Sequence, residues 1–210
     1  MSTEKLTRAL TVADLLSYKP KTLPLTGEWL ECMGAPEQSG GWLIWGGSFS
    51  GKTSFSVQLA YELSKHTRVL YNSLEQGKSE SLKQAFILNN IPLRAKNLLM
   101  VKESYSELIT RLNRPKSPNV VFTDSLQYFD ITYKEYKALK ELFPKKLFVF
   151  ISHADQKQPA GSVAKKIRYD ADVKIWVEGY KAFAESRVIS MGKPYTIYQE
   201  GADRYWLDNK

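Results

Sequence analysis

The sequence is poor in cysteine, since Cys32 is the only one among 210 residues. A single cysteine excludes an internal disulfide bond and any zinc site built from several cysteines. Long apolar runs are also missing, because none approaches the ~20 residues that a membrane-spanning helix needs. The polar start, Met1 to Lys5, does not resemble a signal peptide. These absences predict a soluble, cytoplasmic protein with no membrane partner.

The chain has fewer acidic than basic residues: 22 aspartates and glutamates against 30 lysines and arginines give a net charge of +8. Such a surplus favours a polyanionic partner, most simply nucleic acid. A basic surface that only aids solubility is the alternative interpretation. Apolar residues make up 43% of the chain, and its length suits one α/β domain with a substantial core.

One stretch has the spacing of a phosphate-binding loop, G-x-x-x-x-G-K-[ST]. It lies between a short apolar run, Trp42 to Trp45, and a helical apolar stripe at Phe55, Leu59 and Leu63. A strand, a glycine-rich loop and a helix suit phosphate binding, because backbone N–H groups and the helix N-terminus then surround the phosphate oxygens. A chance glycine-rich turn is the alternative. The expected nucleotide-binding residues are Gly46, Gly47, Ser48, Phe49, Ser50, Gly51, Lys52, Thr53 and Ser54.

Two residues of this loop have specific roles in such a site. Lys52 can reach the β- and γ-phosphates of a nucleotide, and the Thr53 hydroxyl can bind Mg²⁺. Oxygen ligands are what this hard cation prefers. We therefore expect ATP and Mg²⁺ as the cofactors of the protein.

The first forty residues differ from the rest, and we divide the chain into an N-terminal arm and lead-in over 1–40 and a core over 41–210. The run from Thr11 to Leu16 suits a short capped helix that is ended by Pro20. Several prolines and glycines after it break any long element. The sequence leaves two placements of the arm open, either on a neighbouring subunit or on its own domain.

From Trp42 onward, strand and helix patterns alternate. The expected strands cover Arg68–Asn72, Leu98–Val101, Val120–Thr123 and Leu147–Ile151. The expected helices cover Ser79–Asn90, Glu103–Leu112 and Tyr133–Leu142. This alternation predicts an α/β fold with a mainly parallel central sheet and helices on both faces. The tail changes character, and we expect antiparallel C-terminal strands over Val173–Val177, Ala182–Ile189, Tyr195–Tyr198 and Tyr205–Leu207.

Polar residues follow three of the expected strands, at the edge where ligands bind in open parallel sheets. Glu75, Asp124 and His153 come just after the strands at 68–72, 120–123 and 147–151. Asp124 suits the Mg²⁺ shell, and Glu75 suits a base that orients and deprotonates the attacking water. His153 is placed to sense the γ-phosphate and to pass that signal to the following loop. The alternatives are a helix cap for Asp124 and ordinary loop positions for the other two.

Together these motifs resemble the RecA-like ATPase core, over residues 25 to 200. The similarity is greatest to RadA-type recombination ATPases and DnaB-type replicative helicases. It implies that Glu75 is the catalytic glutamate, Asp124 the Walker B aspartate and His153 the polar residue that ends the next strand. It also implies a homo-oligomer, either a ring or a filament. The resemblance rests on Gly46–Thr53, Ser73-Leu74-Glu75, Asp124-Ser125-Leu126-Gln127 and Ile167-Arg168-Tyr169-Asp170-Ala171-Asp172.

The sequence departs from this family at one catalytic position. Such helicases carry Lys-x-Arg on a late strand, and the matching place here reads Glu185-Ser186-Arg187. Arg187 fits the arginine finger that reaches the ATP of a neighbouring subunit, and Lys193 is a candidate substitute for the missing lysine. We find no counterpart of the helicase N-terminal domain or of the additional RadA domains. The chain is therefore most similar to the small RecA-like proteins of phages and mobile elements.

A basic segment, 154–169, follows His153. Its proline and glycine residues predict that part of it is mobile. In the RecA family the loop at this place contacts single-stranded DNA, and cations beside a phosphate sensor can couple DNA binding to the ATP state. A solvated basic loop is the alternative, and Tyr169 is the only aromatic residue at hand for base stacking. The expected DNA-binding residues are Lys157, Lys165, Lys166 and Arg168.

Three functions remain in competition on the sequence. The one we expect is a DNA-stimulated ATPase that acts on single-stranded DNA in recombination, repair or replication. The second is a nucleotide-gated assembly or helicase-loader ATPase with slow turnover, which Glu185 in the finger motif favours. The third is a small-molecule P-loop kinase, for which we find no arginine-rich lid.

Overall fold

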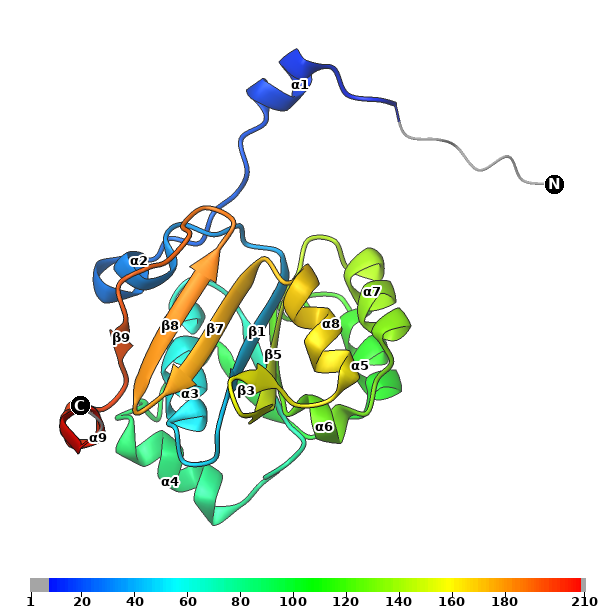
Figure 1. Ribbon diagram of the computed structural model, residues 1–210. Coiled ribbons are helices and arrows are strands. Elements are labelled where there is room, and N and C mark those ends of the chain that lie inside the picture. The colour runs from blue at the N-terminus through cyan, green and yellow to red at the C-terminus, as the bar shows by residue number, and fades with distance from the viewer. Residues whose placement is uncertain (1–7, 209–210) are drawn as a thin grey trace.

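The structure is a computed structural model in which residues 8–208 are described, so the polar start at Met1–Lys5 lies outside the described residues. Its centre is a sheet with strand order β3-β2-β4-β5-β1-β7-β8-β9 (Figure 1). Neighbouring strands from β3 to β7 pair in parallel, and β8 and β9 continue the sheet in antiparallel fashion. The fold class predicted from the alternating pattern is therefore confirmed. The strands are β1 Gly40–Gly46, β2 Val69–Ser73, β3 Leu98–Val101, β4 Val120–Asp124, β5 Leu147–Asp155, β6 Gln158–Pro159, β7 Val173–Glu178, β8 Lys181–Ser186 and β9 Tyr195–Thr196.

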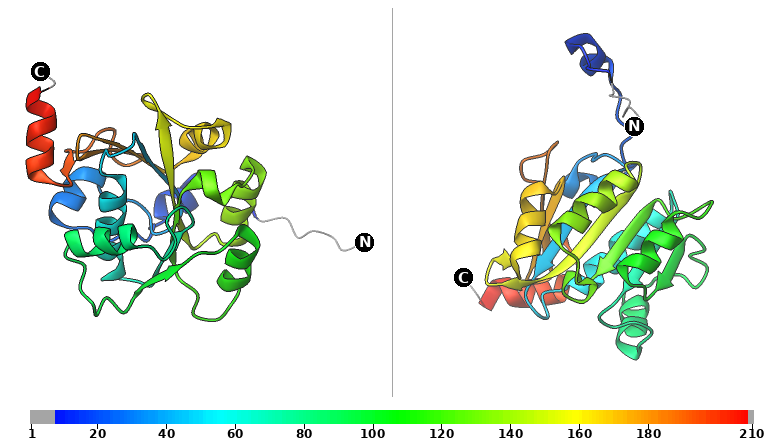
Figure 2. Two further views of the ribbon diagram at one scale, coloured as in Figure 1. Left: turned by 90° about the horizontal axis from the view of Figure 1, so that it is seen from below. Right: turned by 90° about the vertical axis from the view of Figure 1, so that its right-hand side faces the viewer.

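Helices cover both faces of the sheet (Figures 1 and 2). One face carries α2 (Gly27–Met33), α3 (Lys52–Ser64) and α4 (Glu80–Leu88), and the other carries α5 (Tyr105–Leu112), α6 (Leu126–Phe129), α7 (Tyr133–Leu142) and α8 (Ser162–Asp170). Each face of the sheet has its own hydrophobic core. In β1, Trp42 and Ile44 pack into the core beneath α2, α3 and α4, whereas Leu43 and Trp45 pack into the core beneath α5 to α8. Burial on both faces explains why this strand is a continuous apolar run. None of the helices within residues 8–208 has the length and apolarity to cross a membrane.

The N-terminal arm contains the predicted helix, α1 (Val12–Ser17). The Thr11 hydroxyl accepts a hydrogen bond from the Asp14 N–H (3.1 Å), and the Asp14 carboxylate accepts one from the Thr11 N–H (2.9 Å), which is a capping box. The arm stands away from the body of the protein, so α1 does not pack on its own domain (Figures 1 and 2). The first residue of the chain that packs in the hydrophobic core is Leu23, and Cys32 of α2 is buried in the same core.

One expected strand is wrong, because Tyr205–Leu207 lies in a helix, α9 (Gln199–Asp208). Three consecutive large apolar residues favoured a strand in the sequence. The buried positions are instead three and four residues apart, since Ala202 is fully buried and Tyr205 and Trp206 are partly buried. This is the period of a helix. The Trp206 indole N–H donates to the Gly179 carbonyl (3.1 Å), so α9 packs against the turn between β7 and β8.

The basic segment 154–169 is not the loop that the sequence predicted, because it forms a β-hairpin followed by a helix. β5 continues past Ile151 to Asp155 and pairs with β6 in an antiparallel hairpin, after which α8 begins at Ser162. The Ala160 N–H donates to the His153 carbonyl at the base of this hairpin (2.8 Å). His153 therefore lies within β5 rather than after it. The hairpin hydrogen bonds give the segment an ordered backbone that a count of prolines and glycines does not predict.

Candidate nucleotide site

The phosphate-binding loop connects the carboxyl end of β1 to the first turn of α3. Its first glycine, Gly46, passes so close to β7 that a Cβ atom there would collide with the Val177 carbonyl. Gly51 precedes α3 with a φ of 103°, a left-handed conformation that favours glycine. The path of the loop therefore requires both glycines. Across the loop, the Lys52 ammonium donates to the Gly47 carbonyl (2.6 Å).

The turn between β7 and β8 supports the phosphate-binding loop. The Tyr180 N–H donates to the Ser50 carbonyl (3.0 Å), and a Cβ atom on Gly51 would meet the Tyr180 ring. Gly179 and Tyr180 have φ values of 52° and 58°, as in the two-residue turns that suit β-hairpins. A hairpin more than a hundred residues away in the sequence thus fixes the loop. No sequence pattern predicts this contact.

Four strand ends bring polar side chains to one edge of the sheet. Gly46 is opposite His153 in the register of β1 and β5, and Asp124 is opposite Ser73 in the register of β4 and β2. The pocket between them has a volume of about 440 Å³. The structure therefore brings together most of the residues that the sequence predicted for the site. Those that line the pocket are Ser48, Phe49, Gly51, Lys52, Thr53, Ser54, Glu75, Asp124 and His153.

Asp124 is the most buried charged group of the site, with 6% of its surface exposed. Burial raises the pKa of its carboxyl group, and the hydrogen bond from the Tyr71 hydroxyl (2.9 Å) acts in the opposite direction. Tyr71 is fully buried on β2, and the sequence analysis did not identify it. Its hydroxyl fixes one carboxylate oxygen of Asp124 at the edge of the pocket. A carboxylate held in this way suits a hard cation.

Glu75 and His153 are in direct contact across the pocket, with 3.3 Å between the Glu75 Oε2 and His153 Nε2 atoms. Both side chains are about one-third exposed, at 31% and 37%. The Glu75 backbone is anchored as well, because its N–H donates to the Asp124 carbonyl (3.1 Å). The residue expected to orient water and the residue expected to sense the γ-phosphate are therefore in direct contact.

Lys52 is partly withdrawn from solvent at the base of the pocket. Burial lowers the pKa of its ammonium group, while the neighbouring charges of Asp124 and Glu75 raise it. The ammonium group thus lies in a region of negative potential without a direct carboxylate hydrogen bond of its own. A phosphate chain placed beside it would supply the missing anionic partner.

The pocket fits a nucleotide with Mg²⁺. The hydroxyl oxygen of Ser125, which lines the pocket, is buried and has no hydrogen-bond partner within residues 8–208. A ligand that satisfied this group would remove its desolvation penalty. Within the same residues, no three His, Cys, Asp or Glu side chains form a metal site. The Thr53 hydroxyl and the Asp124 carboxylate line the pocket, and such oxygen ligands suit Mg²⁺, which completes its shell with phosphate and water. Thr53 and Asp124 are the residues that would hold it.

Gln127, in the first turn after β4, connects the pocket to the basic segment. Its side-chain amide donates to the Ser152 hydroxyl (2.9 Å) and to the Ala160 carbonyl (3.1 Å). Its oxygen accepts the His153 N–H (3.3 Å). The sequence analysis quoted Gln127 within a motif but gave it no role. A polar residue shortly after a buried strand was the available signal.

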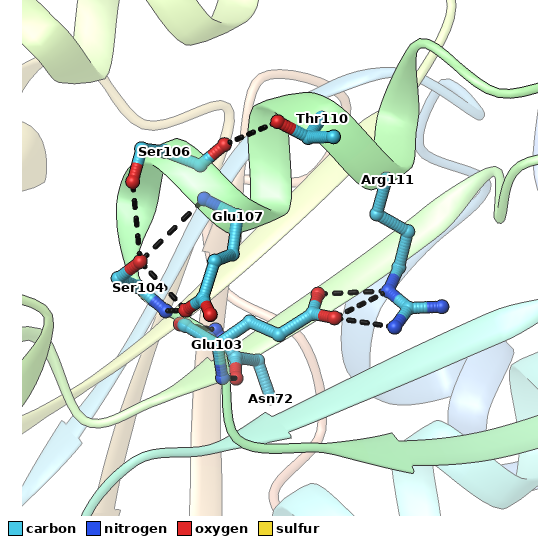
Figure 3. Close-up of polar contacts among 7 residues, drawn as sticks. All are labelled: Asn72, Glu103, Ser104, Ser106, Glu107, Thr110 and Arg111. Carbon is cyan, nitrogen blue, oxygen red and sulfur yellow. Dashed lines mark hydrogen bonds and ion pairs between the residues drawn. The ribbon is translucent and has the colours of Figure 1, made fainter.

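Hydrogen bonds also fix the carboxyl end of β2 on the side of β3, where Asn72 contacts Glu103 (Figure 3). The Asn72 side chain exchanges two hydrogen bonds with the Glu103 backbone, both 2.8 Å long. The Glu103 carboxylate in turn accepts hydrogen bonds from Arg111 of α5, from Nε at 2.7 and 2.8 Å and also from Nη2 (Figure 3). This network ties β2, three residues before Glu75, to the start of α5. It fixes the position of the residue expected to orient water.

The predicted DNA-binding residues occupy two different environments. The Arg168 guanidinium lies over the Trp45 ring, with 5.1 Å to the ring centroid, and donates to the Gln158 side chain. The Lys157 carbonyl accepts the Trp45 indole N–H (3.1 Å). Lys165 and Lys166 are exposed on α8. Arg168 thus stabilises the packing of α8 on β1, whereas the two lysines face solvent.

Arg187 lies at the opposite edge of the sheet, away from its own phosphate-binding loop. It follows β8, where it pairs with Asp172 at the amino end of β7 (3.0 Å). Lys193 pairs with Glu31 (2.9 Å). Any contact between Arg187 and a nucleotide must therefore involve a second subunit.

Comparisons with protein-family models and with curated protein sequences find no match. Many solved structures resemble the chain, and two of them illustrate the likeness. The flagellar accessory protein FlaH from Methanocaldococcus jannaschii matches with a TM-score of 0.58 and 20% identity, over 80% of this chain and 88% of that chain. The KaiC-like protein PH0186 from Pyrococcus horikoshii OT3 matches with a TM-score of 0.54 and 14% identity, over 77% and 86%. This likeness shows that the chain has the RecA-like P-loop fold.

Proposed function

We propose that this protein binds and hydrolyses ATP with Mg²⁺ and acts on single-stranded DNA in recombination, repair or replication. One observation carries the ATPase part: a lysine, two carboxylates and a histidine from four strand ends meet in a single pocket. This set combines a phosphate-binding cation, a base, a metal ligand and a phosphate sensor. The RecA-like fold supports the same conclusion.

Each side chain has a distinct role in this proposal. The N–H groups at the start of α3 and the Lys52 ammonium bind the phosphates. The Glu75 carboxylate accepts a proton from the attacking water, and its contact with His153 keeps it oriented. Mg²⁺, held by Thr53 and Asp124, would neutralise charge on the phosphate oxygens. The hydrogen-bond partners of His153 change when the γ-phosphate leaves.

The DNA part of the proposal rests on the connection between His153 and α8. Gln127 bonds both to the His153 backbone and to Ala160, two residues before α8 begins. A shift of His153 is passed through these hydrogen bonds to the helix that exposes Lys165 and Lys166. The decisive experiment measures ATP turnover with and without single-stranded DNA, alongside light scattering. Turnover that DNA leaves unchanged would contradict this part of the proposal.

Replacing Lys165 and Lys166 together by alanine is expected to weaken single-stranded DNA binding. Each phosphate contact contributes about 0.7 to the slope of log affinity against log salt concentration, so the slope should flatten by up to about 1.4. ATP affinity should stay unchanged, because neither side chain lines the nucleotide pocket. The measurement is a salt titration of fluorescent oligonucleotide binding.

The matched control for this variant replaces Lys96 and Lys145, two exposed lysines in the loops that precede β3 and β5. It removes the same charge at the amino ends of the parallel strands, away from the nucleotide pocket at their carboxyl ends. It should therefore flatten the slope of log affinity against log salt concentration less. Equal slopes for the two double variants would show that α8 makes no special contribution to DNA binding.

The homo-oligomer in our proposal assembles through the N-terminal arm. The arm carries apolar side chains that stand in solvent, with Leu16 81% exposed and Leu15 61% exposed. A groove of about 440 Å³ lies between α4 and the edge strand β3, and Leu82, Phe86 and Met100 line it. We propose that the arm of a second copy occupies this groove. Burial of both apolar surfaces would stabilise the assembly.

Replacing Leu15 and Leu16 by lysine is expected to abolish assembly, because charged side chains enter apolar surface only at a large desolvation cost. The groove is also lined by Lys78, Lys83 and Lys102, which would repel the new charges. The measurement is light scattering with ATP present. Leu142→Lys on α7 is the control, since Leu142 is also 61% exposed but lies outside both the arm and the groove. An oligomer that survives the double substitution would show that the arm is not the contact.

A nucleotide-gated assembly or loader protein with slow turnover is the second candidate function. Glu185 takes the place of a lysine in the finger motif, and the ion pair with Asp172 occupies Arg187. Assembly that depends on ATP, together with turnover that DNA does not accelerate, would favour this function. Acceleration by a small phosphate acceptor would favour a kinase instead.

A further inference from the structure

The outer face of β7 and β8 is an open sheet surface. Within residues 8–208, α8 covers the neighbouring β1 and β5, and α3 lies behind the sheet (Figure 1). Helix α9 reaches this face only at one end, where Trp206 contacts Phe183 and Lys181. Cross-strand neighbours on this face form three pairs: Lys174 with Glu185, Trp176 with Phe183, and Glu178 with Lys181. The aromatic pair lies between two pairs of opposite charge.

Aromatic side chains form one continuous row across this part of the sheet. Trp45 of β1 is in register with Trp176 of β7, with 5.8 Å between their ring centroids. Trp176 is in register with Phe183 of β8, and the Phe183 ring contacts Trp206 of α9 (5.9 Å). Trp45 is buried beneath α8, whereas the other three rings are partly exposed. We call Trp176, Phe183 and Trp206 the aromatic row.

Cations accompany the aromatic row at both ends. The Lys181 ammonium lies over the Trp206 ring (5.6 Å), and the Arg168 guanidinium lies over Trp45, next to Trp176. One acidic neighbour, Glu178, is engaged by hydrogen bonds from the Trp176 indole (3.1 Å) and the Tyr205 hydroxyl (3.2 Å). Partly exposed rings with cations beside them suit a ligand that alternates flat apolar groups with negative charges.

We propose that the aromatic row is a base-stacking surface for single-stranded DNA, separate from the lysines of α8. This inference rests on the proposed action of the protein on DNA. Bases would stack on Phe183 and Trp206, and Lys181 and Arg168 would lie close to the phosphates. The charged pairs on the face balance one another, so the cations at the two ends of the row, Lys181 and Arg168, are what favours an anionic ligand here. One end of the row lies near the nucleotide site, because Trp176 contacts Trp45, which directly precedes the phosphate-binding loop.

Stacking and charge contacts have different salt dependences, and this difference provides the test. Phe183→Ala should weaken binding of an oligo(dT) strand by about tenfold without changing the salt slope, because stacking releases no counterions. Phe183→Tyr keeps a ring and should bind as the wild type does. Nucleotide affinity and circular dichroism, both unchanged, would show that the variants are folded.

An abasic strand of the same length and charge tests the proposal on the unaltered protein. The wild type should bind it about tenfold more weakly than oligo(dT), and Phe183→Ala should bind both strands equally. Equal binding of the two strands by the wild type would overturn the stacking surface and leave DNA binding by α8 intact. No binding of either strand at low salt would overturn both proposals. Loss of the oligomer in Phe183→Ala, with DNA affinity unchanged, would identify the face as a subunit interface instead.

Discussion

Lys52→Ala is expected to weaken ATP binding by on the order of 100-fold, since it removes a charge-assisted contact to phosphate in a partly buried pocket. The Lys52 ammonium already lies within the loop, at 2.6 Å from the Gly47 carbonyl, and two carboxylates lie nearby. Without it, the phosphates of the nucleotide would face Asp124 and Glu75 with no cation from the protein. The expected loss is therefore larger than for a surface charge.

Isothermal titration calorimetry with ATP and Mg²⁺ measures this effect. Lys65→Ala is the matched control, because it removes a lysine from the far end of the same helix, where the side chain is exposed. The control should bind ATP with the affinity of the wild type. If Lys52→Ala also bound ATP normally, the phosphates would have to lie elsewhere, and the assignment of the loop would be wrong.

Glu75→Gln is expected to separate binding from hydrolysis. Glutamine keeps the size and shape of the side chain but cannot accept a proton from water, so turnover should fall by about 10²- to 10⁴-fold. ATP affinity should be unchanged or slightly higher, because a negative charge beside the phosphates is removed. The contact with His153 can persist as a hydrogen bond to the amide.

Phosphate release at saturating ATP measures turnover, and calorimetry measures affinity in parallel. Glu141→Gln on α7 is the control, since Glu141 is exposed and does not line the nucleotide pocket. Normal turnover of Glu75→Gln would show that another residue positions the attacking water. A loss of both turnover and affinity would instead indicate that the substitution disturbs the backbone after β2. The hydrogen bonds between Asn72 and Glu103 fix the end of that strand.

The sequence alone determined the phosphate-binding loop and the positions of the parallel strands along the chain. Both depend on local patterns: the loop motif from Gly46 to Thr53 occupies eight consecutive positions, and buried strands are short apolar runs. Glu75 and Asp124 were found in the same way, because ligands gather at the carboxyl ends of parallel strands. These features need no knowledge of which distant residues touch.

Only the tertiary structure decided the contacts between distant residues. The hydrogen bond between Tyr71 and Asp124, the pair of Glu75 with His153 and the support of the loop by Tyr180 all depend on strand order and register. A one-residue change in register moves every side chain of a strand to the other face. Local patterns therefore do not encode these contacts.

The same reason explains the two errors in the sequence analysis. Tyr205–Leu207 has the local composition of a strand, but the turn between β7 and β8 offers a surface that a helix covers. The segment 154–169 has the composition of a loop, but β6 pairs with β5 and Arg168 packs on Trp45, so the segment forms a hairpin and a helix. The aromatic row likewise joins residues from three separate parts of the chain, and only the register of β7 and β8 and the packing of α9 place them side by side.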